Sequence, residues 1–465
     1  MPEFAPELLA RWTDGRWTEE PGRSLTGFAI DTRQLNAGEV FVALRTDKRD
    51  GHDFLAAARE AGASAALVSR RVEGVALPQL VVNDPAAAFR AIAREHRRRF
   101  DGPVIGVTGS AGKTSTKNLL ALLLGPRTLA TEGNLNNTLG VPLTLTRLDP
   151  AQHRYAVIEA GISEPGEMEL LARMIEPDVA IVTLVAPAHT QDLGGLAGVA
   201  QEKALLPARV RESGVAIFHA DLRQHAAFRD LPVAALHLVR LGQSGSEALP
   251  RPVEFSMEHR GNETVVHLHR SGAAAERFSL RRVSDGMAEN AALALTAALW
   301  LGESPAALQP RLATWTPGAM RGEIRRTETQ LLYLDCYNAN PASMRDALAV
   351  FTEIAPARER RLYVLGGMEE LGAESGHYHH QLGATLRLRE QDMVYVIGDE
   401  AEAVRAGALA AGARPGQVTV VTSLAPVQEQ LREFRGAVFL KGSRKYRLES
   451  VLGALQPEAA PGATH

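Results

Sequence analysis

The residues with the clearest chemical meaning form a glycine-rich loop at 109–114. Its sequence, Gly-Ser-Ala-Gly-Lys-Thr, follows an apolar strand pattern and precedes a helical one, so its backbone N–H groups and the positive end of that helix can face phosphate oxygens. Lys113 would reach the outer phosphates, and the Thr114 hydroxyl would hold Mg²⁺. The loop departs from the usual eight-residue spacing, because Val107 stands five positions before Gly112. A chance glycine turn is the alternative, and the strand–loop–helix context favours a nucleoside triphosphate.

Three further candidates follow predicted strands of the same segment. Glu159 ends the strand predicted at 155–159, at the edge where open α/β sheets bind ligands, and its carboxylate could take a Mg²⁺ shared with the γ-phosphate. On position alone, a surface acid at a strand end is an equally good interpretation. His189 comes after the strand predicted at 178–182, and Lys203 lies in a helix predicted at 196–211. Taken singly, a loop histidine and a solvated lysine are the simpler interpretations.

Two amide-rich segments could bind polar groups of a substrate. Asn134, Asn136 and Asn137 lie in a loop after the strand predicted at 128–131, and amides both donate and accept hydrogen bonds. Turn chemistry explains asparagines in such a loop equally well. In the segment 335–341, Asp335 ends a predicted strand and could accept hydrogen bonds from ribose hydroxyls or from an amine. Cys336 is a poor candidate nucleophile, because nothing near it in the sequence resembles its general base.

The elements that must position these residues alternate between strand and helix. Up to about residue 100 the pattern is α/β, and a helix at 85–99 ends in three arginines that suit a helix C-terminus and need no ligand. From 101 to 316 the alternation predicts a mostly parallel sheet with helices on both faces, followed by an antiparallel hairpin around 260–262. From 317 to 465 a second α/β series predicts a doubly wound, Rossmann-like sheet.

Composition agrees with an α/β protein of three domains. The chain has 465 residues, which exceeds what one core usually organises. Its 51 basic and 54 acidic residues give a net charge of -3, which argues against a general electrostatic grip on nucleic acid or anionic membrane. A single cysteine excludes an internal disulfide and fits a reducing compartment. We find no secretory signal and no apolar stretch long enough to span a bilayer, so we expect a cytoplasmic protein.

At these motifs the chain resembles the Mur ligases, and the resemblance covers nearly its whole length. Residues 31–33, 38–44 and 50–54 resemble the UDP-sugar-binding domain of that family. Residues 106–114 have the family's shortened phosphate loop, which accounts for the unusual spacing. Within the family, four segments are similar to the branch that adds D-alanyl-D-alanine: 133–145, 337–341, 366–372 and 441–444.

The resemblance implies an ATP-dependent ligase of peptidoglycan synthesis. It would join D-alanyl-D-alanine to UDP-MurNAc-tripeptide through an acyl phosphate, using ATP and Mg²⁺, as a monomer with no nucleic-acid partner and no membrane span. It implies three domains: a UDP-substrate-binding domain at 1–100, an ATP-binding domain at 101–316 and a ligase domain at 317–465. It also implies that CO2 carbamylates Lys203, which turns a cation into a carboxylate-like oxygen ligand beside Mg²⁺.

The resemblance also assigns residues to sites, position by position. The implied catalytic residues are Lys113, Glu159, His189 and Lys203, and the implied metal-site residues are Thr114, Glu159, His189 and Lys203. The implied ATP-binding residues are Gly109, Ser110, Ala111, Gly112, Lys113, Thr114, Ser115, Asn290, Arg321 and Asp335. The implied substrate-binding residues are Asp31, Thr32, Arg33, Asn134, Asn136, Asn137, Tyr337, Asn338 and Asn340.

Two alternatives stay open at this point. One is a ligase of the same fold that adds a different amino acid, such as another Mur ligase or folylpolyglutamate synthase. About 100 residues precede the phosphate loop here, which argues against folylpolyglutamate synthase, because that enzyme starts near its loop. The other alternative is a P-loop switch or kinase that binds partners through its other domains. Phosphate release that requires both a UDP-peptide and an amine would favour the ligase.

Overall fold

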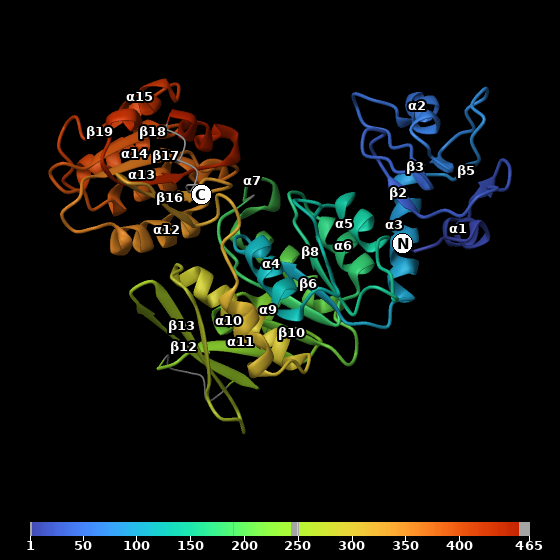
Figure 1. The fold of residues 1–465 in the computed structure, drawn as a ribbon, viewed down its shortest axis with the longest axis horizontal. Coiled ribbons are helices and arrows are strands. Elements are labelled where there is room, and N and C mark those ends of the chain that lie inside the picture. The colour runs from blue at the N-terminus through green and yellow to red at the C-terminus, as the bar shows by residue number, and fades with distance from the viewer. Residues whose placement is uncertain (1, 189, 243–248, 250, 455–465) are drawn as a thin grey trace, which may run out of the picture.

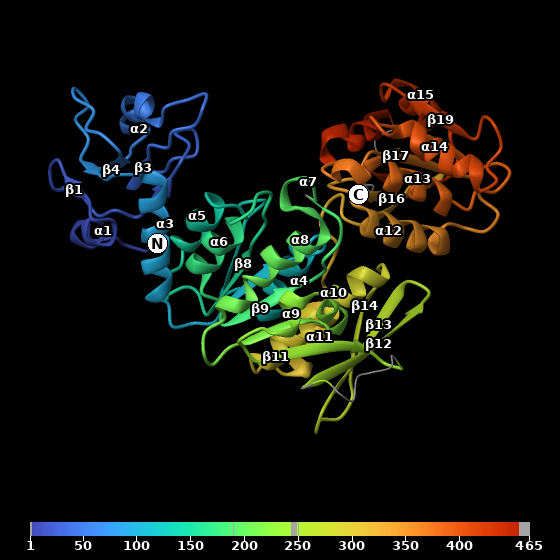
Figure 2. The same cartoon turned by 180° about the vertical axis from the view of Figure 1, so that it is seen from behind.

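The computed structural model describes residues 2–188, 190–242, 249 and 251–454. Its strands form three sheets that follow one another along the chain. Figures 1 and 2 show from both sides that the N-terminal and C-terminal parts lie at opposite ends of the molecule, with the central part between them. The predicted α/β fold in three parts is therefore confirmed. In the described parts of the chain, no helix is both long and apolar enough to cross a membrane.

The N-terminal sheet has the strand order β1-β5-β4-β3-β2, and its pairs are parallel except for β1 with β5. Asp84 caps the last helix of this part, because its carboxylate accepts hydrogen bonds from the N–H groups of Ala86 and Ala87. The elements are α1 (Pro6–Thr13), β1 (Arg16–Trp17), β2 (Gly27–Ala29), β3 (Glu39–Val42), α2 (Leu55–Glu60), β4 (Ala65–Val68), β5 (Gln79–Val81) and α3 (Pro85–Arg98).

The central sheet has nine strands in the order β14-β13-β12-β11-β10-β9-β6-β8-β7. Neighbouring strands are parallel from β7 to β12, and β12, β13 and β14 are antiparallel, as the predicted hairpin requires. From β6 the chain passes to β7 and β8 on one side and then crosses to β9 on the other side of β6. The carboxyl end of β6 is therefore a topological switch point, where open sheets bind ligands. The elements are β6 (Val104–Thr108), α4 (Lys113–Leu124), β7 (Thr128–Ala130), α5 (Gly140–Leu145), β8 (Tyr155–Glu159), α6 (Glu167–Ile175), β9 (Val179–Val182), α7 (Thr190–Leu193), α8 (Gly195–Ala204), β10 (Val215–His219), α9 (Ala226–Arg229), β11 (Ala235–Arg240), β12 (Pro252–Arg260), β13 (Glu263–Arg270), β14 (Glu276–Arg281), α10 (Asp285–Trp300) and α11 (Pro305–Ala313).

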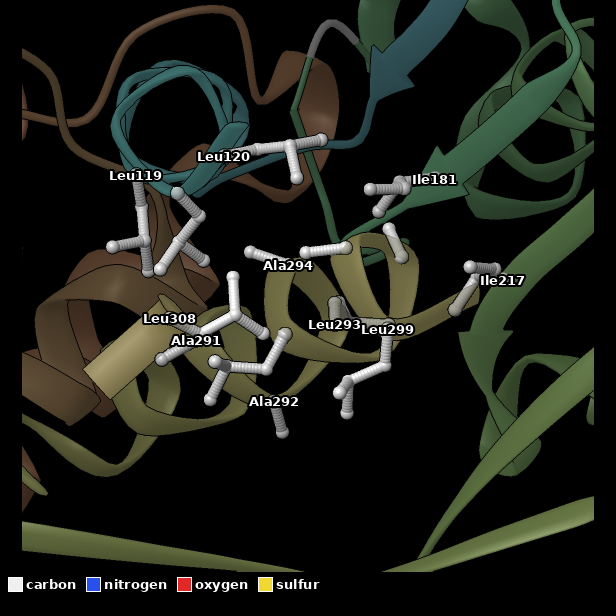
Figure 3. Close-up of a cluster of buried hydrophobic side chains, with 14 of the residues drawn as sticks. Leu119, Leu120, Ile181, Ile217, Ala291, Ala292, Leu293, Ala294, Leu299 and Leu308 are labelled. Carbon is white, nitrogen blue, oxygen red and sulfur yellow. The ribbon is translucent and has the colours of Figure 1, made fainter. Parts of the chain in front are cut away.

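Helix α10 lies in the core on one face of this sheet. Every residue from 291 to 299 is buried, which is the pattern of a helix enclosed on all sides. Figure 3 shows Leu119 and Leu120 of α4 packed against Ala291 and Leu293 of α10. A second core, built from α5, α6 and α8, covers the other face of the sheet. The strand–loop–helix unit of the phosphate loop is thus held between two cores.

The C-terminal sheet has the order β15-β16-β20-β17-β18-β19 and is parallel except between β15 and β16. The five strands predicted for this part are all present. The elements are β15 (Glu323–Arg326), β16 (Gln330–Asp335), α12 (Pro341–Ile354), β17 (Arg361–Gly366), α13 (Ser375–Thr385), β18 (Met393–Ile397), α14 (Ala401–Ala410), β19 (Val418–Val421), α15 (Ala425–Glu433) and β20 (Gly436–Lys441).

Several local predictions were wrong. The helix predicted at 196–211 ends at Ala204, and Pro207–Arg209 forms a separate 3-10 turn, because a proline inside a helix lacks the N–H that the helix needs. The loop that carries Asn134, Asn136 and Asn137, expected to extend to Pro142, ends where α5 begins at Gly140. Strands β1, β2, β5, β11, β14 and β15 were not predicted. Proline, alanine and glycine at 456–465 predict a frayed tail, and this segment lies outside the described residues.

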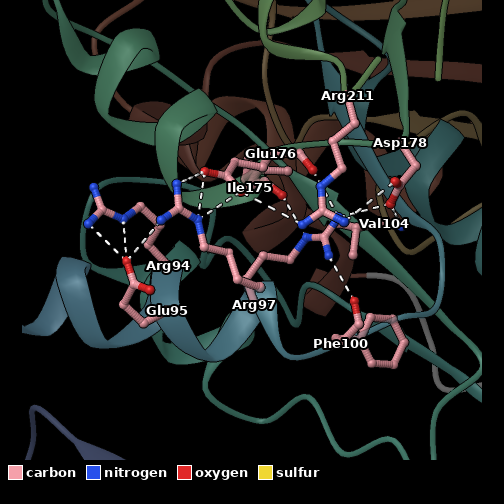
Figure 4. Close-up of polar contacts among 10 residues, drawn as sticks. Arg94, Glu95, Arg97, Phe100, Val104, Ile175, Glu176, Asp178 and Arg211 are labelled. Atoms are coloured by element: carbon pink, nitrogen blue, oxygen red, sulfur yellow. Dashed lines mark hydrogen bonds and ion pairs between the residues drawn. The ribbon is translucent and has the colours of Figure 1, made fainter. Parts of the chain in front are cut away.

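Two of the three arginines at the end of α3 bind residues of the central part. Arg97 is fully buried, and its guanidinium donates to the carbonyl oxygens of Ile175 and Glu176 and to the Asp178 carboxylate, each at 2.8 Å (Figure 4). Arg98 remains half-exposed and pairs with Glu176 at 2.5 Å. Burial lowers the pKa of Arg97 to about 10, so it stays charged at neutral pH. These arginines fasten α3 to the central part through protein partners.

Candidate active site

A cavity of about 850 Å³ lies between the central and C-terminal parts, a size typical of small-molecule and cofactor sites. It opens at the carboxyl ends of β6, β8 and β16. Most residues that the sequence predicted for the site line it: Ser110, Ala111, Gly112, Lys113, Thr114, Ser115, Asn134, Asn136, Asn137, Glu159, Asn290, Arg321, Asp335, Tyr337, Asn338 and Asn340.

The phosphate loop is held tightly by its neighbours. The Thr183 hydroxyl donates to the carbonyl oxygen of Ala111 at 2.5 Å. A Cβ atom added at Gly109 would lie 1.9 Å from the oxygen of that hydroxyl, and one added at Gly112 would lie 2.4 Å from Nδ2 of Asn290. Both positions therefore require glycine, because side chains of neighbouring elements occupy the space that any other residue would need.

Lys113 folds back over its own loop. Its Nζ donates to the carbonyl oxygen of Gly109 at 2.7 Å. Burial lowers the pKa of Lys113, and the charge of Glu159 opposes this shift. A lysine held at the loop is in place to exchange a carbonyl oxygen for the oxygens of a phosphate, which is the stronger partner because it is charged.

Ser110 ties the loop to the segment that follows β9. Its N–H donates to the carbonyl oxygen of Leu184 at 2.7 Å, and its hydroxyl donates to that of Ala186 at 2.8 Å. The N–H of Ala186 returns a hydrogen bond to the Ser110 oxygen at 3.0 Å. This segment leads to His189, which lies outside the described residues, so the prediction for His189 stays a prediction.

Glu159 is buried at the end of β8, with one oxygen occupied and one free of protein partners. Oε1 accepts from the Thr114 hydroxyl at 3.1 Å and from the Asn136 amide at 2.8 Å. Oε2 is buried and has no hydrogen-bond partner among the described residues. An orphaned carboxylate oxygen beside a phosphate loop fits Mg²⁺, which takes one or two carboxylates together with phosphate oxygens. The described residues contain no group of three or more His, Cys, Asp or Glu side chains that could hold a metal ion by themselves.

Lys203 lies near Lys113 but is not among the residues that line the cavity. It is buried in α8. Burial lowers its pKa well below the ordinary value of a lysine, and the positive charge of Lys113 lowers it further. The side chain therefore holds its proton weakly, in contrast with the solvated lysine that position alone suggested.

The C-terminal part brings three charged residues to the cavity. Asp335 pairs with the buried Lys441 at 2.5 Å, and Lys441 also donates to the carbonyl oxygen of Asn338 at 3.3 Å. Burial raises the pKa of Asp335, and Lys441 opposes this shift. The guanidinium of Arg321 lies over the ring of Tyr337, 3.8 Å from its centroid. Cys336 is buried, which raises the pKa of its thiol to about 11, so its thiolate is not available as a nucleophile.

Two of the predicted substrate-binding amides have local structural roles. Oδ1 of Asn137 accepts from the N–H groups of Leu139 and Gly140, at 3.2 and 2.8 Å, as the turn interpretation expects. Asn340 caps α12 in a reciprocal arrangement with Ser343. The Asn340 amide also donates to the carbonyl oxygen of Ser110 at 3.3 Å. Asn340 therefore joins the C-terminal part to the phosphate loop.

The structure does not bring Asp31, Thr32 and Arg33 to this cavity. They follow β2 in the N-terminal part, at the far end of the molecule from the C-terminal sheet (Figure 1). The exposed Arg33 guanidinium hydrogen-bonds Asp31 and holds the pKa of that carboxyl at about 2.

Among the lining residues that were not predicted as site residues are Thr183, His219, Asp221, Arg282, Asp346 and Lys441. Two of them had a usable signal, since Thr183 follows the strand predicted at 178–182 and Lys441 follows the one predicted at 437–440, both at ligand-binding edges. Asp346 lies inside a helix of another part of the chain, and nothing in the sequence links it to the central part.

Models of three Mur ligase domains match successive segments of the chain. The family catalytic domain matches residues 24–99, the middle domain 107–298, and the glutamate ligase domain 320–444. These segments cover the phosphate loop, Glu159, Asn290 and the residues that the C-terminal part contributes to the cavity.

Curated and solved proteins match the chain over nearly its whole length. The UDP-N-acetylmuramoyl-tripeptide--D-alanyl-D-alanine ligase of Escherichia coli (strain K12) is 33% identical over 455 residues, which are 96% of this chain and 98% of that protein. A crystal structure of MurF from Acinetobacter baumannii superposes with a TM-score of 0.85 at 28% identity, covering 98% of this chain and 99% of that one. The MurF ligase from Thermotoga maritima in complex with ADP gives 0.77 at 26% identity, covering 92% and 96%.

Proposed function

We propose that this chain, which belongs to the Mur ligase family, joins D-alanyl-D-alanine to UDP-MurNAc-tripeptide and that ATP hydrolysis drives the reaction. The product, UDP-MurNAc-pentapeptide, is a precursor of peptidoglycan. The observation that carries the proposal is a single cavity that joins a phosphate loop and Glu159 of the central part to the Asp335–Lys441 pair of the C-terminal part. Relatives that match between 82% and 96% of the chain are named for this reaction.

The reaction has two chemical steps. The terminal carboxylate of the tripeptide attacks the γ-phosphorus of ATP, so that an acyl phosphate forms and ADP leaves. The amine of D-alanyl-D-alanine then attacks the acyl carbon, and the tetrahedral intermediate expels phosphate as the amide forms and the amine loses a proton. Lys113 spreads the charge that develops on the transferred phosphoryl group, in a site that holds the reacting groups in line.

The donor set around Glu159 fits Mg²⁺. Thr114, Glu159 and His189 would hold it together with phosphate oxygens, and it would supply neutralising positive charge to the phosphates. Asn136 and Thr114 fix the Glu159 carboxylate through Oε1, which leaves the buried Oε2 available.

Carbamylation of Lys203 is part of the proposal and is supported by the environment of its amine. Only a neutral amine reacts with CO2, since the nitrogen lone pair must form the new N–C bond while a proton leaves. Burial and the nearby Lys113 favour that neutral form. The product is an anion, which offsets the positive charge of Lys113 and of the metal.

The site lies where the central and C-terminal parts meet, which suits a reaction through an acyl phosphate. Closure of the C-terminal part over the nucleotide would exclude water that otherwise hydrolyses the intermediate. We propose domains at 1–100, 101–316 and 317–465, with Asp31, Thr32 and Arg33 contacting the UDP end of the substrate. We also propose that the protein acts as a monomer in the cytoplasm.

Phosphate release by the purified protein tests the function. With ATP, Mg²⁺, UDP-MurNAc-tripeptide and D-alanyl-D-alanine present, we expect release together with a pentapeptide product that mass spectrometry identifies, and no release when either co-substrate is omitted. Release without the amine would favour a switch or kinase. Faster turnover with a single amino acid than with the dipeptide would favour another Mur ligase. Parallel trials with lysine and meso-diaminopimelate tripeptides would identify the third residue.

A further inference from the structure

The first turn of α10 takes one of its caps from a different part of the chain. The N–H groups of a first turn have no partner inside their helix. Ser284 caps this helix in the usual way, accepting from the Met287 N–H at 3.2 Å. The Gly286 N–H instead donates to Oδ1 of Asp346, at 3.0 Å. Asp346 lies in α12 of the C-terminal part.

The contact leaves no room for a side chain at position 286 unless Asp346 moves. A Cβ atom there would lie 2.8 Å from Oδ2 of Asp346. Alanine is otherwise the better residue inside a helix, by about 1 kcal/mol over glycine, and would also lower the entropy of the unfolded chain. The glycine at 286 is therefore explained by the close contact with Asp346 and not by the stability of α10.

Helix α10 transmits this contact to the phosphate loop. Asn290 lies four residues after Gly286, so both are on the same face of the helix, one turn apart. The Asn290 amide packs on Gly112, where an added Cβ would lie 2.4 Å from its Nδ2. Helix α12 also contacts the phosphate loop itself, because Asn340, which caps α12, donates to the carbonyl oxygen of Ser110 at 3.3 Å. Helix α12 thus reaches the loop directly at Ser110 and through α10 at Gly112.

We propose that Asp346 is a positioning residue for the nucleotide: it caps α10 across the boundary between the two parts and so sets how Asn290 and the phosphate loop meet the bound nucleotide. This inference rests on the proposed use of ATP. Asp346 touches no reacting atom, so its effect is on nucleotide affinity and on KM for ATP rather than on the chemical step. The same helix supplies a matched control, because Glu353, seven residues on, pairs across the same boundary with Arg282, which precedes α10 in the sequence.

Binding of ADP with Mg²⁺, measured by calorimetry, tests the proposal. In Asp346→Ala we expect the Kd for ADP and the KM for ATP to rise about tenfold, as for the loss of a helix cap, with kcat within about threefold. Asp346→Asn keeps an acceptor for the Gly286 N–H and should recover most of the affinity. Glu353→Gln should stay within about twofold of the wild type, because it replaces a side chain that is 60% exposed with one of the same size and leaves the Gly286 cap untouched.

A second variant separates positioning from folding. Gly286→Ala should weaken ADP binding about as much as Asp346→Ala, although alanine favours the helix, and the double variant should be no weaker than either single one. Thermal unfolding of each variant shows whether the fold is kept.

Three results would overturn the proposal: wild-type affinity in Asp346→Ala, an equal loss in Glu353→Gln, or a Gly286→Ala variant that binds ADP normally. If the wild type binds ADP but forms no peptide bond, the proposed ligase function falls while these affinities still decide the role of Asp346. If the wild type binds no ADP, both fall.

Discussion

The side-chain amide of Asn136 donates to Oε1 of Glu159 at 2.8 Å, the oxygen that also accepts from the Thr114 hydroxyl. Two donors on one oxygen leave the other, Oε2, buried and without a hydrogen-bond partner among the described residues. A buried carboxylate oxygen without a partner is costly. The arrangement therefore points that oxygen to a cation, and the Asn136 amide fixes the orientation of the carboxylate.

Replacing this carboxylate tests its role directly. Glu159→Gln should lower kcat by about a hundredfold or more, because an amide is neutral and a weak ligand for Mg²⁺. Asn136→Ala should cost about ten- to a hundredfold by releasing the carboxylate. Phosphate release over a Mg²⁺ titration measures both. Glu164→Gln, an exposed acid in the following loop, is the control. Half or more of the wild-type activity in Glu159→Gln would remove Glu159 from the metal site.

The lack of space beside Gly109 predicts that any side chain at this position disrupts the phosphate loop. In Gly109→Ala the new methyl group would meet the Thr183 hydroxyl, which holds the carbonyl of Ala111, and the loop must move to relieve the clash. We expect ADP binding to fall below detection in calorimetry while the protein remains folded by circular dichroism. Gly22→Ala, where an added Cβ has no neighbour within 4 Å, should bind like the wild type. Wild-type affinity in Gly109→Ala would show that the loop does not hold the nucleotide.

The lowered pKa of Lys203 predicts how its carbamate depends on pH. The neutral amine reacts with CO2, and a depressed pKa means that this form persists to lower pH than in an ordinary lysine. Carbamate formation should therefore be present at neutral pH and decline as the pH falls through the lowered pKa. Carbon-13 NMR with labelled bicarbonate would follow the carbamate signal across pH. Lys203→Arg should lack the signal and the activity, and an unchanged signal in that variant would place the carbamate elsewhere.

The buried Arg97 predicts a large stability effect far from the cavity. Arg97→Met keeps much of the side-chain volume but leaves the Ile175 and Glu176 carbonyls and the Asp178 carboxylate without their donor. Removing one partner of a buried charged pair costs about 3 kcal/mol or more of unfolding free energy. The neighbouring Arg98→Gln, which loses a half-exposed pair with Glu176, should cost about 1 kcal/mol or less. Urea unfolding measures the free energy of unfolding of both variants. Equal losses would contradict the conclusion that the buried Arg97 contributes more to stability than Arg98.

Most strands, the phosphate loop and the lining residues near it were predictable because each rests on a local pattern. The apolar strand before Gly109 and the helix after it are adjacent in the sequence, so their geometry follows from short-range physics. Asp346 and Gly286 are 60 residues apart, and no period or motif connects them. The burial of Lys203 and Arg97 was missed for the same reason. Burial depends on which distant segments pack against a helix, whereas the local sequence predicts only the helix itself.

Helix α3 has a consequence for how the molecule moves. Phe89 and Ile92 on one side of it belong to the core of the N-terminal sheet, while Ala93 belongs to a core of the central part and Arg97 is hydrogen-bonded to the carbonyl oxygens at the C-terminal end of α6. A helix shared by two cores resists bending between them, because bending would open both cores. We therefore expect large rearrangements at the other junction, around residues 313–322, where the chain passes to the C-terminal sheet without a shared helix.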